Sequence, residues 1–123
     1  MKKFTLYLSL LLCSTLLMAQ PDISIVEAAA NGDLEKVEAH LTSGTDINDR
    51  YGEKESTALH AAAYHGNLEI VKFLIEKGAE INARNKHGQT PRDVAWDDME
   101  NERFSDSEKE SKRKAGEFIE GKG

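Results

Sequence analysis

An internal repeat constrains this chain more than any other feature of its sequence. Segment 27–35 (EAAANGDLE) aligns without gaps with segment 61–69 (AAAYHGNLE), and the same register continues to a Gly, an Ile and an Asn in both copies. The offset is 34 residues throughout, and a third, partial copy begins at Thr90, which follows Thr57 by 33 residues. A fixed period of this length predicts stacked supersecondary units, each of which buries its apolar face against its neighbours.

The first half of each unit is predicted to be a short helix. In the second copy, Thr57 is a candidate N-cap for a helix over residues 58–64. The alanines of this segment form a face of small side chains, which allows the backbone of a neighbouring unit to approach closely. Gly66 follows at the position where a helix needs a residue in the left-handed conformation to end it.

The second half of the unit is predicted to be a longer, more apolar helix. Asn67 is a candidate N-cap, and apolar residues, Leu74 among them, cover a broad surface over 68–75. A surface helix needs only one apolar stripe, so the excess predicts contact with two neighbouring units. Gly78 is then expected to end this helix. Together the two halves predict an all-α helical hairpin.

The C-terminal unit departs from this pattern. We predict its first helix from residue 90 to about 98, but the acidic stretch 97–102 lacks the expected glycine turn. Ser105 followed by Glu108 matches a capping box, which predicts a last helix from 106 to about 119. The middle of this helix is strongly charged, so we expect it to project from the stack and the last glycines to fray.

With these residues in view, the chain resembles the ankyrin-repeat family over roughly residues 23–98. The matching text is TALHAA at 57–62, GNLEIVKFLI at 66–75 and GAEIN at 78–82, and Thr90-Pro91 opens the next repeat. The resemblance implies a solenoid of two clear repeats plus a modified C-terminal capping repeat. We place the repeats at about 23–48, 49–82 and 83–119.

Three residues depart from the family pattern. Ala58 stands where the family usually has Pro, and Asp93 stands where it has His. Trp96 replaces a small residue, which predicts that the stack closes there. We expect its indole to fill the core as a cap, with a position along the groove as the alternative.

The N-terminus reads as a signal peptide over residues 1–19, which leaves a repeat domain over 20–123. Lys2 and Lys3 precede an uncharged, largely apolar run over 4–18, and the small residue Ala19 stands before the expected cut. The run is shorter than the roughly 20 residues of a membrane span. A retained N-terminal anchor and lipidation of Cys13 remain alternatives.

Charge and cysteine content limit the possible partners of the exported form. Loss of Lys2 and Lys3 takes the formal net charge from −6 to −8, and such an acidic chain repels nucleic acid and anionic membranes. Cys13 is the only cysteine, so the mature domain has no disulfide, thiol nucleophile or cysteine metal ligand. We therefore expect a monomer that is stabilised by packing alone.

Candidate binding residues come from the resemblance and from the predicted loops. In the family, a Thr and a His at the positions of Thr57 and His60 form a local hydrogen-bond network, which we favour over a His60/His65 metal pair. In the family, the two positions after the alanines face a concave groove, and we expect the loops at residues 49–56 and 83–89 to be exposed, as binding loops usually are. The candidate partner-binding residues are Tyr51, Lys54, Tyr64, His65, Arg84, His87, Asp97 and Asp98.

No catalytic or cofactor motif stands out. The sequence lacks a G-x-S-x-G elbow, a P-loop and an H-E-x-x-H pair, and the acidic stretch 97–102 does not have the spacing of an EF-hand loop. We therefore expect no cofactor and a non-enzymatic protein–protein interaction module that acts after export, in the periplasm or outside the cell. The resemblance implies an accessory or inhibitor of another exported protein; a membrane-tethered structural stub is the alternative.

Overall fold

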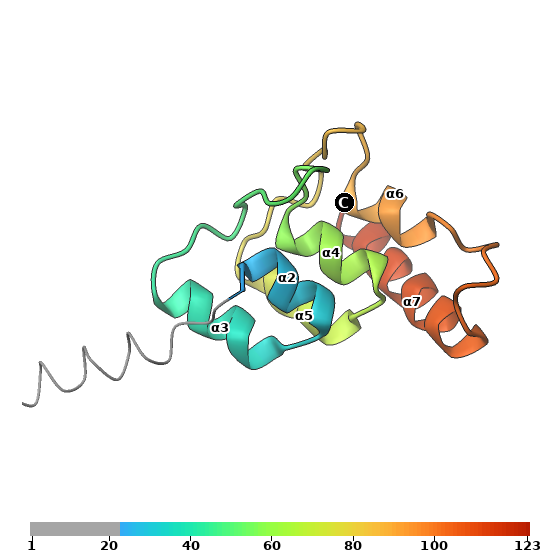
Figure 1. The fold of residues 1–123 in the computed structure, drawn as a ribbon, viewed down its shortest axis with the longest axis horizontal. Coiled ribbons are helices and arrows are strands. Elements are labelled where there is room, and N and C mark those ends of the chain that lie inside the picture. The colour runs from blue at the N-terminus through green and yellow to red at the C-terminus, as the bar shows by residue number, and fades with distance from the viewer. Residues whose placement is uncertain (1–22) are drawn as a thin grey trace, which may run out of the picture.

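The computed structural model describes residues 23–123, which form helical hairpins stacked side by side (Figure 1). Over these residues the regular structure is α-helical, with one isolated antiparallel bridge between Tyr51 and Ser56. The predicted signal peptide and Cys13 lie outside the described residues. Within residues 23–123, no helix combines the length and the apolar character needed to cross a membrane.

The first hairpin consists of α2 (Ile25–Asn31) and α3 (Leu34–Thr42). Ser24 and Glu27 form a reciprocal capping box at the start of α2, so two otherwise unpaired backbone N–H groups are satisfied. Gly32 ends the helix with φ +76°, a conformation that glycine adopts without steric cost. The chain can therefore reverse directly into α3.

The second hairpin consists of α4 (Ala58–Tyr64) and α5 (Leu68–Glu76), and the bounds of α4 are those predicted. One expected cap is wrong. Asn67 stands at the N-cap position of α5, but its side chain makes no capping bond there. Its Nδ2 instead donates to the Ala29 and Ala30 carbonyl oxygens at 2.7 and 3.3 Å. The side chain thus satisfies the C-terminal carbonyls of α2 and links two repeats.

The C-terminal unit consists of α6 (Pro91–Trp96) and the long α7 (Asp106–Lys122). Helix α6 ends two residues earlier than predicted, and the turn that follows uses Asp98 in the left-handed region (φ +56°) where glycine was missing. The capping box of Ser105 and Glu108 is confirmed. We expected the last glycines to fray. Helix α7 instead continues to Lys122 and includes Gly121.

Helices α2, α4 and α6 lie side by side as one layer, and α3, α5 and α7 form a second layer packed against it (Figure 1). Buried aliphatic and alanine side chains of both layers form one continuous core. Leu74 is completely buried, as predicted. Because α4 lies between α2 and α6, its small side chains (Ala58, Ala62 and Ala63) are the ones that permit the close stacking.

Two expectations about the C-terminal cap are wrong. The charged middle of α7 does not project, because the helix docks against α4, α5 and α6 and buries Lys112, Ala115, Gly116 and Ile119. Trp96 does not fill the core: 38% of its surface is exposed. A Cβ added at Gly116 would lie 3.1 Å from two atoms of the Trp96 indole ring, so glycine is what allows the two helices to approach.

Candidate protein-binding groove

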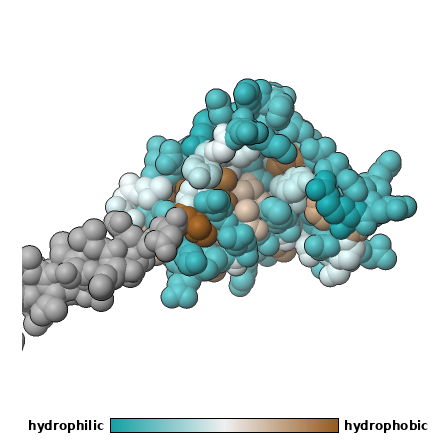
Figure 2. Space-filling model, in the orientation of Figure 1, coloured by the Kyte–Doolittle hydropathy of each residue, from teal (hydrophilic) through white to brown (hydrophobic). Residues whose placement is uncertain are grey.

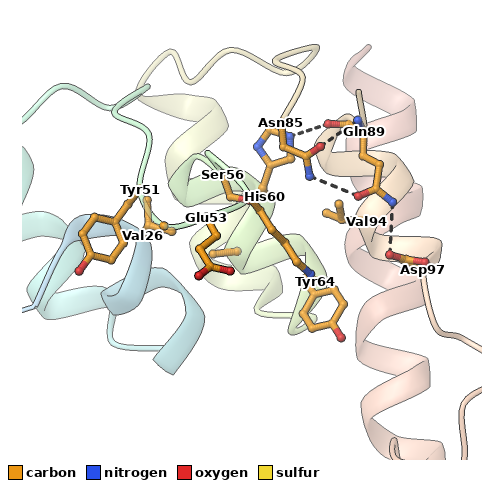
Figure 3. Close-up of a pocket in the computed structure, with 13 residues that line it drawn as sticks. Val26, Tyr51, Glu53, Ser56, His60, Tyr64, Asn85, Gln89, Val94 and Asp97 are labelled. Carbon is orange, nitrogen blue, oxygen red and sulfur yellow. Dashed lines mark hydrogen bonds between the residues drawn. The ribbon is translucent and has the colours of Figure 1, made fainter. Parts of the chain in front are cut away.

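A hollow of about 410 Å³ opens along the layer of α2, α4 and α6, beneath the loop at residues 49–56 (Figure 3). Val26, Ala61 and Val94 line it, one from each of the three helices. We call this hollow the concave groove, the loop 49–56 the first finger and the loop 83–89 the second finger. In Figure 2, apolar surface gathers in the middle of the displayed face and hydrophilic side chains surround it.

Two tyrosines stand along the groove. Tyr51 belongs to the first finger, which the Tyr51–Ser56 bridge holds as a tight hairpin, and 52% of its surface is exposed. Tyr64 ends α4. In the view of Figure 3, the Glu53 carboxylate lies between the two rings. The groove thus combines apolar helical residues with aromatic and charged groups at its edge.

Gln89, the last residue of the second finger, organises the polar edge of the groove (Figure 3). Its backbone N–H donates to Asn85 Oδ1 at 3.0 Å, and its Nε2 donates to Asp97 Oδ2 at 3.3 Å. The Gln89 carbonyl oxygen accepts from the Asn85 backbone N–H at 2.9 Å. This network joins the second finger to the end of α6 and holds the polar edge of the groove in place.

His60 ties α4 to the same residue. Its Nε2 lies 2.8 Å from the Gln89 carbonyl oxygen, and its Nδ1 accepts from the Thr57 backbone N–H at 3.2 Å. A neutral ring with the proton on Nε2 satisfies both contacts. Burial lowers the pKa of His60 below 6.5, since the charged form would lose its hydration. The structure therefore uses Thr57 and His60 in the hydrogen-bond network that the resemblance implied.

Tyr64 is held by contacts within the protein. Its hydroxyl donates to Asp98 Oδ2 at 3.2 Å, and its ring packs edge-on against Phe104 and His65, at centroid distances of 5.8 and 5.1 Å. Partial burial, together with the Asp98 carboxylate, raises the pKa of the phenol above 10. Partial desolvation and the nearby positive charge of Lys112 lower the pKa of His65, although part of the residue is exposed.

Lys112 is the feature of this region that the sequence reasoning missed. It is fully buried, and its Nζ donates to the Asp97 carbonyl oxygen at 2.8 Å. The same Nζ lies 4.2 Å from the centroids of both the Tyr64 and Phe104 rings. Burial lowers its pKa, while the charges of Asp98 and Asp97 oppose that shift. A signal was present, because Lys112 shares a helical face with the apolar residues Ala115 and Ile119.

The structure brings some of the predicted binding residues together and not others. Four of them line the concave groove: Tyr51, Lys54, Tyr64 and Asp97. Asp98 and His65 contact Tyr64 from outside it. Arg84 and His87 lie on the second finger and do not line it; Arg84 donates to the Gly88 carbonyl oxygen at 2.7 Å and so stabilises the finger itself.

Four further polar residues line the groove although they were not singled out: Glu53, Ser56, Asn85 and Gln89. The repeat register could have indicated that Ser56 and Gln89 occupy equivalent positions, because they are separated by the same 33 residues as Thr57 and Thr90. The Lys54 ammonium lies 5.8 Å from the Tyr64 ring centroid and adds a positive charge to a lining that also holds the carboxylates of Glu53 and Asp97. Across residues 23–123, no three His, Cys, Asp or Glu side chains gather as a metal site would require.

Stacked helical hairpins, left-handed glycine turns and a concave groove under two fingers define a helical-repeat solenoid. The family model for ankyrin repeats (three copies) matches residues 25–100, more than half of the chain. The chain therefore belongs to the ankyrin-repeat family.

Curated relatives share the repeats within longer proteins. The chain is 40% identical over 68 residues to potassium channel AKT1 of Arabidopsis thaliana, and 40% identical over 67 residues to ankyrin repeat and SAM domain-containing protein 6 of Rattus norvegicus. These matches cover 55% and 54% of the chain and 8% of each relative. Protein phosphatase 1 regulatory subunit 27 of Mus musculus is 35% identical over 77 residues, which is 63% of the chain and 50% of that protein.

Proposed function

We propose that the chain is a non-enzymatic protein-binding module, and that its concave groove holds a segment of another protein. The observation that carries the proposal is the groove itself: apolar residues from three helices, the half-exposed ring of Tyr51, and a hydrogen-bonded polar edge built on Gln89. Aromatic side chains at the edge of an apolar hollow are common binding hot spots. Ankyrin repeats generally act in binding other proteins, which supports the same conclusion.

We further propose that the module acts as a monomer after export, as an accessory or inhibitor of an exported protein. The basic start, the uncharged run over 4–18 and Ala19 support export. One relative is named as a regulatory subunit, which favours an accessory role. Mass spectrometry of the N-terminus tests this. A start at Gln20 supports release after export, whereas a retained or lipid-modified start would favour the membrane-tethered alternative.

The binding experiment uses the full chain with a C-terminal tag, purified with its partners from the exported fraction of its own cells. Tyr51→Ala removes the exposed ring without touching the core, and Glu76→Ala on α5 is the matched exposed control behind the groove. Loss of a hot-spot aromatic should weaken the affinity for a partner so identified by about 30-fold. Equal recovery of the same partner by wild type and Tyr51→Ala would show that this part of the groove is not the binding surface.

A further inference from the structure

Helix α7 does not line the concave groove, but one of its side chains contacts residues that do. Lys112 lies in the middle of α7, and its buried ammonium contacts three groups: the Asp97 carbonyl oxygen at 2.8 Å and the Tyr64 and Phe104 rings, both at 4.2 Å. These groups come from the end of α4, the residue after α6, and the connection from α6 to α7. Two of them, Tyr64 and Asp97, also line the groove. The same contacts therefore dock the helix and form one end of the groove.

Stability alone is a poor explanation for a lysine at this position. Lysine is almost never fully buried, because removing its charge from water costs more than burying an apolar side chain of similar length. The Asp97 carbonyl and the two ring faces offset part of that cost, since each presents partial negative charge to the ammonium. An apolar side chain would pack in this space without orienting those groups. What the lysine adds is directional attraction toward three separate elements.

The backbone around Lys112 is equally close to α4. A Cβ added at Gly66, which follows α4, would lie 2.6 Å from the Lys112 backbone nitrogen and 2.7 Å from the Ser111 carbonyl carbon. Glycine is thus required here for space as well as for its φ of +69°. This contact sets α7 directly on the end of α4 and gives the Lys112 side chain a fixed starting point beside Tyr64.

We propose that Lys112 is a positioning residue for the concave groove: its ammonium holds Tyr64, Phe104 and the Asp97 carbonyl in place, so the C-terminal end of the groove exists in this form only while α7 is docked. The importance of this end for a partner rests on the proposed function. The positioning itself is a property of the free protein. It can therefore fail or hold independently of whether a partner binds there.

The test compares Lys112→Met with Lys114→Met in the full chain. Methionine keeps an unbranched apolar side chain and removes the charge, while Lys114 is an exposed lysine on the same helix and serves as the matched control. Three backbone amides report on the segment that Lys112 holds: Asp97, Asn101 and Phe104, each of which donates to a backbone carbonyl within residues 94–101. Hydrogen exchange at these amides and the NMR resonances of the Tyr64 ring are the measurements, with Tyr51 as the internal reference.

In Lys112→Met we expect exchange at the three amides to rise about tenfold, because one buried hydrogen bond and two cation–π contacts are lost. The Tyr64 ring resonances should shift while those of Tyr51 stay, and urea unfolding should remain a single transition of nearly unchanged midpoint. Lys114→Met should leave all of these unaltered. A purely structural role would instead lower the unfolding midpoint and raise exchange throughout the core.

Unchanged amide exchange and unchanged Tyr64 resonances in Lys112→Met would overturn the inference. If that variant does not fold, Phe104→Leu provides the second route, because it removes one ring and leaves the lysine in place. We expect it to raise exchange at Asp97 and Asn101, and to move the resonances of the Lys112 side chain, whose ammonium faces the ring. A Phe104→Leu protein with wild-type exchange and wild-type Lys112 resonances would also contradict the proposal.

Discussion

The second repeat and the C-terminal unit are neighbours in one stack, yet different contacts hold them. Helix α5 of the second repeat has nine residues and buries Ile70, Val71 and Leu74. Helix α7 has 17 residues and buries Lys112, Ala115, Gly116 and Ile119, most of them small or charged. Its outer face carries an ion-pair cluster in which Arg113 contacts Glu110 and Glu117.

The difference between α5 and α7 shows how the last unit of a short repeat stack can face water. A repeat with neighbours on both sides needs a broad apolar helix, and α5 provides it. The last unit has one side open to water, so α7 keeps a charged outer face and docks through glycine, alanine, one isoleucine and one buried cation. Small side chains bring its backbone close to α4 and α6, while the charged side chains keep the exposed end soluble.

The largest effect expected from the loss of side-chain packing lies in the second repeat. Leu74→Ala should lower the free energy of unfolding by about 2–5 kcal/mol, because Leu74 is fully buried and its truncation leaves a cavity between repeats. Urea denaturation followed by circular dichroism measures this loss. Leu68→Ala on the same helix, where the side chain is only partly buried, is the control and should cost less. Equal losses in the two variants would mean that Leu74 is not a core residue.

Two glycines that follow the helices of the second repeat test the contact between the two regions. Gly66 and Gly78 both have positive φ (+69° and +92°), so alanine at either position should cost about 1–2 kcal/mol of backbone strain. At Gly78 a Cβ meets nothing within 4 Å, whereas at Gly66 it meets the backbone of α7. Overpacking should therefore add about 1–3 kcal/mol for Gly66→Ala alone.

Urea denaturation of both glycine variants provides this measurement. Helix α7 should also lose protection from hydrogen exchange in Gly66→Ala and keep it in Gly78→Ala. If the two variants lose equal stability, then the docking of α7 on α4 is looser than the structure shows.

The smallest expected effect is a pH dependence of stability that comes from His60, which links α4 to the loop before α6. Because burial lowers the pKa of His60, the folded protein binds fewer protons at this ring than the unfolded chain does. The contribution of His60 to stability is therefore fully present above pH 6.5 and decreases as the pH falls below it. His65 has a shift in the same direction and adds to this dependence.

Urea unfolding at pH 7.5 and at pH 5 checks the sign. The wild type should be less stable at the lower pH, and His60→Gln should show a smaller difference between the two values. Some dependence should remain in the variant because His65 is unchanged. A variant with the full wild-type difference would show that His60 does not cause the loss of stability in acid.

Much of the fold could be predicted because the helix ends of an ankyrin repeat are marked by residues at or next to them in the sequence. Thr57, Gly66 and Gly78 mark helix ends by their capping and backbone preferences, and the 34-residue period orders the units. The groove was less predictable. Tyr51 was predicted from its place in a loop, and Tyr64 from its place in the repeat. Gln89 is held at the groove by hydrogen bonds to Asp97 and His60, and these contacts exist only in the folded chain.

The sequence by itself determined the family, the hairpin of each repeat and the residues that end its helices, because these depend on contacts between residues a few positions apart. Only the tertiary structure decided how the stack closes. Asn67 caps the helix of another repeat rather than its own, Trp96 lies half-exposed against Gly116, and Lys112 turns inward from a helix that reads as solvent-exposed. Each of these depends on what packs against the residue from elsewhere in the chain, and no local pattern encodes that neighbour.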